Sequence, residues 1–156
     1  MTMATGHDRL TPEGKRFFAE LEKLKRLQVR VGFQKGAATS ADGVDLCDVA
    51  MWNELGTATS PSRPFLRESV DSHEAEILTF GQLQAKRLVK GATAESVLQQ
   101  LGVEQKSLVQ QTILDGDFAP NAPSTIKKKG SDKPLIDTSQ MLQSVNFTIT
   151  QKGGGG

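Results

Sequence analysis

The sequence has few of the residues that build metal and redox sites. Cys47 is its only cysteine, and His7 and His73 are its only histidines. A single cysteine cannot form an intrachain disulfide, which is typical of a reducing compartment and argues against a secreted, disulfide-rich scaffold. A metal site needs clustered ligands, and His73 with Glu76 supplies only two. We therefore expect no metal and no cofactor.

Motifs for nucleophilic catalysis and phosphate binding are also missing. The chain contains no G-x-S-x-G elbow, no P-loop and no G-x-G-x-x-G. A Ser-His-Asp arrangement could use only His73, and no residue pattern marks its partners. We expect that the protein is not an enzyme. The alternative is a hydrolase that uses His73, which requires a cleft where this histidine meets a serine and a carboxylate.

The chain has no surplus of one charge. Its 19 basic and 18 acidic residues give a net charge of +1, unlike a dedicated nucleic-acid binder. The basic run Lys127, Lys128 and Lys129 has no aromatic residues interleaved, and such a short run is usually a solvated face. A small DNA-binding regulator that uses this run is an alternative from another functional class. No segment is typical of a signal peptide or a membrane span, so we expect no membrane partner.

The sequence does contain a succession of helix and strand patterns. Thr11 caps a helix that has proline at its first position, and Asp45 and Thr93 cap two later helices. Alternating apolar and polar residues predict two strands, one before the middle of the chain and one near its end. The predicted elements are a helix over 12–27, a strand over 29–33, a short helix from 45 to 56, a long helix from 65 to 91, a helix from 93 to 116, short helices near 126 and 140, and a closing strand over 145–149.

This order predicts an α+β fold with a small, mostly antiparallel sheet packed with a long helix and several shorter helices. We expect a flexible N-terminal arm over residues 1–10, a single domain over 11–151 and a disordered glycine tail over 152–156. Gly81 and Gly102 lie inside predicted helices, where glycine costs roughly 1 kcal/mol relative to alanine. A kink or close packing is therefore expected at either position.

Four motifs in order carry a resemblance to a known family. They are Val49-Ala-Met-Trp-Asn-Glu-Leu-Gly-Thr57, Ser60-Pro-Ser-Arg-Pro-Phe-Leu-Arg67, Ala122-Pro-Ser-Thr-Ile-Lys127 and Pro134-Leu-Ile-Asp-Thr-Ser-Gln-Met-Leu-Gln-Ser-Val145. Together, over about residues 29–150, the chain resembles the tail-completion and neck proteins of long-tailed bacteriophages, which include minor tail proteins like lambda Z. It departs from the family pattern at Leu55, Ser62 and Ser139, where phenylalanine, alanine and glycine are usual.

The resemblance implies a structural virion protein that forms a ring, hexameric in the family, at the head-proximal end of the tail. Such a ring completes the tail and joins it to the head, and genomic DNA passes transiently through its lumen. The implied partners are other copies of the chain, a tail-terminator or tail-tube protein, and a head-side connector or stopper protein. The implied location is the head–tail junction of the virion, after assembly in the host cytoplasm. A head-side connector or a tail-terminator ring is the alternative within this class.

The second motif contains the predicted subunit interface. Two prolines limit the freedom of the unfolded arm and so lower the cost of ordering it on a partner. Arginines that flank a Phe-Leu pair are typical of interface hot spots. The alternative is that Phe65 and Leu66 cap the core of their own subunit. Trp52 is assigned to packing and Leu55 to the inner side of its helix, and the lysine run could face the lumen or the outside. The predicted interface residues are Pro61, Arg63, Pro64, Phe65, Leu66 and Arg67.

Overall fold

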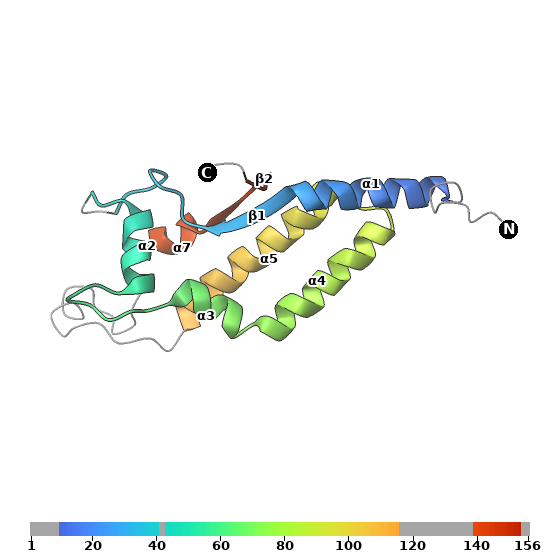
Figure 1. Ribbon diagram of the computed structural model, residues 1–156. Coiled ribbons are helices and arrows are strands. Elements are labelled where there is room, and N and C mark those ends of the chain that lie inside the picture. Colours follow the sequence, from blue (N-terminus) through green and yellow to red (C-terminus); the bar gives the residue numbers. More distant parts are fainter. Residues whose placement is uncertain (1–9, 41–42, 116–138, 154–156) are drawn as a thin grey trace.

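The computed structural model describes residues 10–40, 43–115 and 139–153, which form six helices and one two-stranded sheet (Figure 1). This arrangement confirms the predicted α+β class. Within these residues, no helix combines the length and apolar character that a bilayer crossing requires. The elements are α1 (Pro12–Arg26), β1 (Leu27–Gly32), α2 (Leu46–Leu55), α3 (Phe65–Asp71), α4 (Glu74–Val89), α5 (Ala94–Asp115), α7 (Ser139–Ser144) and β2 (Asn146–Gln151).

The sheet joins two distant parts of the chain. Strands β1 and β2 pair antiparallel, with Val29 opposite Ile149 and Val31 opposite Phe147. Both strands pack against α5, which runs along the sheet. A Cβ atom on Gly102 of α5 would lie 2.3 Å from the ring of Phe147. The expected close packing at Gly102 is therefore confirmed, because only glycine lets the helix approach the strand so closely.

Helix α5 is the centre of the fold. Eight of its residues are buried, more than in any other described element. Its C-terminal half contributes Val109 and Ile113 to the main apolar cluster, which also contains residues from α2, α3 and α7. The apolar side chains of that cluster are those of Ala50, Phe65, Val109, Ile113, Met141 and Val145.

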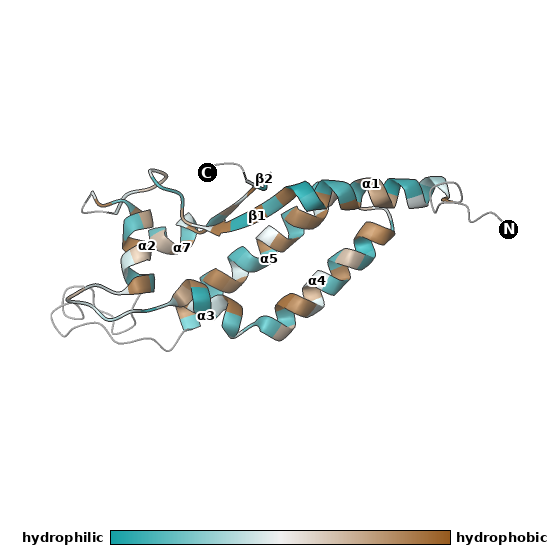
Figure 2. Ribbon diagram, in the orientation of Figure 1, coloured by the Kyte–Doolittle hydropathy of each residue, from teal (hydrophilic) through white to brown (hydrophobic). Residues whose placement is uncertain are grey.

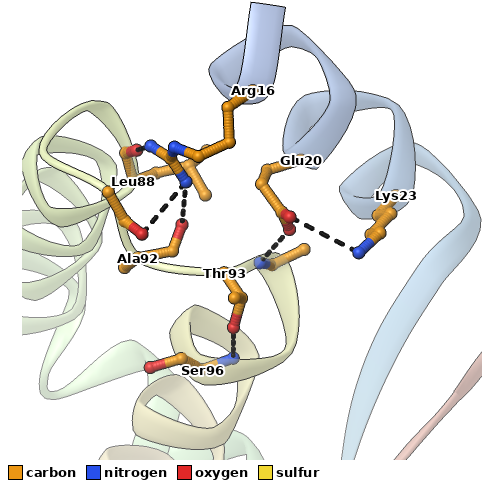
Figure 3. A network of polar contacts seen from close by, with 9 residues as sticks. Arg16, Glu20, Lys23, Leu88, Ala92, Thr93 and Ser96 are labelled. Carbon is orange, nitrogen blue, oxygen red and sulfur yellow. Dashed lines mark hydrogen bonds and ion pairs between the residues drawn. The ribbon is translucent and has the colours of Figure 1, made fainter. Parts of the chain in front are cut away.

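Helix α1 is fastened to the turn between α4 and α5 by polar contacts (Figure 3). The buried carboxylate of Glu20 accepts a hydrogen bond from the backbone N–H of Ala94 at 2.7 Å, at the first residue of α5. This bond lowers the pKa of Glu20, and burial opposes it. The guanidinium of Arg16 donates to three carbonyls at the end of α4 and in the turn, those of Leu88 (3.2 Å), Gly91 (3.0 Å) and Ala92 (3.3 Å).

Glu20 and Arg16 each pair with backbone groups of the opposite partial charge at a helix end. The start of a helix exposes unpaired N–H groups and the end exposes unpaired carbonyls, with the matching ends of the helix dipole. The acidic side chain therefore suits the start of α5, and the basic one suits the end of α4. The side chain of Thr93 completes the turn, because its Oγ1 accepts from the N–H of Ser96 at 3.1 Å, as the predicted cap requires.

The predicted long helix from 65 to 91 is wrong in one respect, because it is broken between α3 and α4. His73 has non-helical backbone angles of φ −122° and ψ 22°. Its ring Nδ1 lies 3.0 Å from the carbonyl oxygen of Ser69, which a continuous helix would pair with the backbone N–H of His73. That N–H bonds instead to the carbonyl of Val70. The side chain thus replaces a helical bond and turns the chain.

The C-terminal strand is slightly longer than predicted. The N–H of Lys152 donates to the carbonyl of Arg26 at 2.8 Å, so this residue, assigned from sequence to the terminal tail, continues the pairing of the sheet. The predicted N-terminal arm, except Leu10, and the last three glycines lie outside the described residues.

Candidate assembly interface

Helix α2 carries most of the first of the four family-like motifs, and one side of it faces the core. Asp45 caps the helix, because its Oδ1 accepts from the N–H of Cys47 at 2.9 Å. Lys35 pairs with Asp48 at 2.6 Å and so fastens the preceding loop to the first turn. Leu46 and Ala50 are the two buried residues of the helix.

The other side of α2 is also apolar, and it is open to solvent. Trp52 is 45% exposed, Met51 is 49% exposed and Leu55 is 72% exposed. The expectation that Leu55 points inward is therefore wrong, because the core lies on the side of Ala50, and Leu55 falls on the opposite side of the helix. Large apolar side chains that lie together on a protein surface often mark a contact with a partner. We call the side chains of Met51, Trp52 and Leu55 the α2 patch.

The chain leaves α2 through a sharp turn at Gly56. This glycine has a φ of 78°, and a Cβ atom here would lie 2.8 Å from the backbone nitrogen of Ser62. The following arm then doubles back onto the helix end. The hydroxyl of Ser62 donates to the carbonyl of Glu54 at 2.7 Å, and the N–H of Arg63 donates to the carbonyl of Asn53.

Glu54 joins α2 to α3. One carboxylate oxygen accepts from the N–H of Leu66 at 2.8 Å and the other from the N–H of Arg67 at 3.1 Å. These amides belong to the first turn of α3, where a carboxylate also suits the helix dipole. The Asn-Glu-Leu-Gly motif therefore builds an internal joint that fixes the angle between two helices.

The prediction that Phe65 lies in a subunit interface is wrong, because the start of α3 is held against the core. Phe65 has no exposed surface, and its ring packs edge-on against Phe33 with centroids 5.8 Å apart. The aromatic anchor predicted for a partner is thus a core residue of its own chain, and Leu66 packs partly buried beside the same cluster. The alternative reading of this pair is confirmed.

The rest of the predicted interface is divided. Pro61 and Arg67 are exposed, while Arg63 and Pro64 are half-buried. The Nη1 of Arg63 donates to the Oδ1 of Asn53 at 3.5 Å, so this arginine is bonded to the end of α2. Lys127, Lys128 and Lys129, together with the third motif, lie outside the described residues.

The exposed tip of the arm extends the α2 patch. Thr57 organises the tip, since its Oγ1 accepts from the N–H groups of Thr59 (3.3 Å) and Ser60 (3.0 Å). An open groove runs between the tip and the helix. Its lining residues are Val49, Trp52, Asn53, Thr57, Thr59, Ser60 and Arg63. Trp52 therefore belongs both to the patch and to the groove, and the joint positions the two together.

Sequence reasoning missed Met51 and Leu55 as surface residues. The signal was present in the sequence of α2, because Met51, Trp52 and Leu55 fall on the side of the helix away from Leu46 and Ala50. Leu46 and Ala50 are enough to cover the side that meets the core. The remaining apolar residues could then have been recognised as unpartnered within one subunit.

The part of the chain that the structure describes offers little for chemistry. No group of three or more potential metal ligands occurs there. The hydroxyl of Ser72 donates to Glu68, and that of Ser69 donates to the carbonyl of Leu66, so neither donates to His73. No protein-family model, curated protein or solved structure matches this chain. The features of this chain that bear on function are therefore its sequence motifs and the α2 patch with its arm.

Proposed function

We propose that this protein is a structural subunit of a phage tail, which forms a ring at the head-proximal end of the tail and joins the tail to the head. The observation that carries the proposal is the α2 patch, which the described residues leave uncovered. The motifs of α2 and the arm are those that resemble tail-completion proteins, and their side chains orient this surface. The function and the exposed surface thus involve the same short segment.

Burial of the patch would contribute substantially to assembly. Fully covering one large apolar side chain contributes about 1.5–3 kcal/mol. Tryptophan and methionine are both enriched in protein interfaces. Since each side chain of the patch is about half exposed or more, a neighbouring subunit could recover a large part of this free energy.

A closed ring of identical subunits requires two different surfaces on each subunit that fit one another. The α2 patch and the arm supply one of these surfaces in our proposal. The balanced net charge of +1 suits a channel for DNA, since a strongly basic lumen would retain the genome electrostatically.

The proposal is tested by removing the gene from the phage that encodes it. We expect filled heads and separate tails that do not join, seen by electron microscopy. Normal particle yield without the gene would contradict the proposal. Particles blocked before DNA packaging would indicate a head-side role, and tails of uncontrolled length would indicate a terminator.

Complementation with variants then ties the role to the patch. Leu55→Lys supplied in trans should fail to restore infectious particles, because it places a charge in the covered surface. Val103→Lys on α5, where valine is similarly exposed at 48%, is the matched control and should restore them. Equal rescue by both variants would separate the patch from the function.

A further inference from the structure

Helix α1 is attached to the rest of the molecule by different means along its length. At its C-terminal end it passes into β1 without a loop, since α1 ends at Arg26 and β1 begins at Leu27. The N–H of Lys152 donates to the carbonyl of Arg26 and so holds this end to β2. Figure 1 shows α1 leading away from the sheet. Further along the helix, Arg16 and Glu20 reach the turn between α4 and α5 (Figure 3).

Helix α1 has no buried apolar row. Among its fifteen residues, all of which the structure describes, only Glu20 is buried, with 7% of its surface exposed. Phe17, Leu21 and Leu24 are half-buried, and Phe18 is 48% exposed. Figure 2 shows α1 as a largely hydrophilic helix. A surface helix is ordinarily held by an apolar stripe that faces the core, so α1 depends to an unusual degree on its buried carboxylate.

The carboxylate of Glu20 meets a backbone amide on one side and cations on the other. Its Oε2 accepts from the N–H of Ala94 at 2.7 Å, and its Oε1 lies 3.4 Å from the Nζ of Lys23. The charges that act on it come from Lys23 and Arg16, which both belong to α1. The contact between α1 and α5 therefore joins an ionised side chain to an uncharged N–H group.

The facing helices also have charged groups near this turn. Arg87 of α4 is bonded to other side chains of α4 and α5, and Lys86, Lys90 and Glu95 are exposed. Arginine and lysine stay charged from neutral to acid pH. Among the described residues, Glu20 is therefore the buried group at this contact whose charge changes in acid.

We propose that Glu20 is an acid-sensitive latch, and that its protonation releases α1 from the turn between α4 and α5 while the rest of the fold stays in place. An ionised carboxylate binds an N–H about twice as strongly as a neutral acceptor does. It also suits the positive end of the dipole at the start of α5. Protonation removes both contributions, and Lys23 loses its counter-charge. The clamp from Arg16 to the backbone carbonyls then remains without the latch.

The direction of the pH effect follows from the contact with Ala94. This N–H lowers the pKa of Glu20 below its ordinary value of 4.5, and burial opposes the shift. The carboxylate is therefore ionised and the latch is closed above pH 4.5. The latch opens as pH falls through the folded-state pKa, because the released helix takes up the proton more readily.

The release is local because the main apolar cluster lies elsewhere. From Ala94 to Val109, the first cluster residue of α5, the helix rises roughly 22 Å at 1.5 Å per residue. The sheet packs on α5 through the ring of Phe147 at Gly102, a contact that acid does not change. The latch shares no residue with the α2 patch or the arm, so it goes beyond the proposed function and does not depend on it.

Hydrogen exchange with mass spectrometry tests the latch in the full chain, from about pH 7 to about pH 3, a range that we choose around the pKa. Protection factors, corrected for the pH dependence of intrinsic exchange, are compared for residues 12–26 of α1 and residues 105–113 of α5. We expect the protection of α1 to fall about tenfold or more in acid, because a charged hydrogen bond is lost. The segment of α5 should keep its protection over the same range.

The variant Glu20→Gln removes the charge and keeps the shape of the side chain. Its α1 should exchange about tenfold faster than in the wild type already at neutral pH, and its protection should not fall further in acid. Glu22→Gln is the matched control, because Glu22 is exposed on the same helix and its bond with Lys25 lowers its pKa below 4.5 as well. This control should follow the wild type at every pH.

Three results would overturn the latch. They are an α1 whose protection does not depend on pH, an α1 and an α5 segment that lose protection together, and a Glu20→Gln variant that exchanges like the wild type. Arg16→Gln is a second variant in case Glu20→Gln does not fold. It should lower the protection of α1 by a similar factor at every pH and keep the acid step, because Glu20 is still present. Disappearance of the acid step in Arg16→Gln would also contradict the proposal.

Discussion

Helices α5 and α2 differ in how much of their apolar surface is buried. In α5, eight residues are buried, and they face the sheet and the surrounding helices. In α2, only Leu46 and Ala50 are buried, and three large apolar side chains point outward. Figure 1 shows the geometric reason, since α5 lies inside the molecule and α2 lies at one end of it.

The difference separates two kinds of stabilisation. Most apolar side chains of α5 are buried within one subunit, and Val103 and Leu114 are the exposed exceptions. The outer surface of α2 is only partly covered by that fold, and for its exposed apolar side chains we propose contact with a neighbouring subunit. Substitutions near α5 should therefore change the free energy of unfolding, whereas substitutions on the α2 patch should change assembly.

The largest effect is expected at Phe65, which joins α3 to the cluster around α5. Phe65→Ala should reduce the free energy of unfolding by about 3–5 kcal/mol, because it removes a fully buried ring and leaves a cavity. Chemical denaturation followed by circular dichroism measures this change. A loss below about 1 kcal/mol would show that Phe65 does not serve the core.

A smaller effect is expected at Glu20, which caps the start of α5. Glu20→Ala should cost about 1.5–3 kcal/mol, because it removes a charged hydrogen-bond partner from a buried N–H. Glu22→Ala is the matched control on the same helix, where an exposed carboxylate pairs with Lys25, and should change stability by less than about 0.5 kcal/mol.

The same residue predicts a pH dependence. The N–H of Ala94 lowers the pKa of Glu20 in the folded protein below its ordinary value of 4.5. The unfolded chain therefore takes up a proton first, so the stabilisation is complete above pH 4.5 and is lost as pH falls through the folded pKa. Glu20→Ala should lose less stability than the wild type between pH 5 and pH 3, the interval that we choose for denaturation. Parallel losses would contradict the assignment.

Two glycines give a matched pair of substitutions with opposite signs. Gly102→Ala should destabilise the protein by about 1–3 kcal/mol, since the added Cβ collides with the ring of Phe147. Gly81→Ala should stabilise it by up to about 1 kcal/mol, because its Cβ would meet no atom within 4 Å and alanine favours a helix. Thermal melts of the two variants check this, and the same sign for both would refute the packing argument.

The smallest effect on folding is expected at Leu55. Leu55→Ala should change the free energy of unfolding by no more than about 0.5 kcal/mol, as for other exposed positions. Denaturation of this variant beside Phe65→Ala makes the contrast between the two regions quantitative. A loss comparable to that of Phe65→Ala would place Leu55 in the core and remove the α2 patch.

Local signals in the sequence predicted much of this fold. The caps at Thr11, Asp45 and Thr93 predicted three helix starts, and alternation predicted both strands, because these features depend on near neighbours. The break at His73 escaped prediction, since it depends on a ring nitrogen that replaces a backbone bond. The outward direction of Leu55 also escaped prediction, because it depends on where the neighbouring elements lie in space.

The predicted interface contains one residue, Phe65, that the structure places in the core of its own chain. The Arg-Phe-Leu-Arg composition is typical of an interface, yet Glu54 draws the start of α3 inward and carries Phe65 into the core. The exposed apolar side chains lie instead on α2, one helix earlier. Composition alone cannot distinguish these outcomes, because a Phe-Leu pair between arginines can serve either a core or a partner.

The fluorescence of Trp52 tests the central claim most directly. It is the only tryptophan of the chain, which has no tyrosine, so intrinsic emission excited at long wavelength reports on the α2 patch alone. As the protein assembles into rings, followed by sedimentation, we predict that the emission shifts to shorter wavelength and that acrylamide quenches it less. Rings that form with unchanged emission and quenching would contradict the account, because Trp52 would then remain open to solvent in the assembled state.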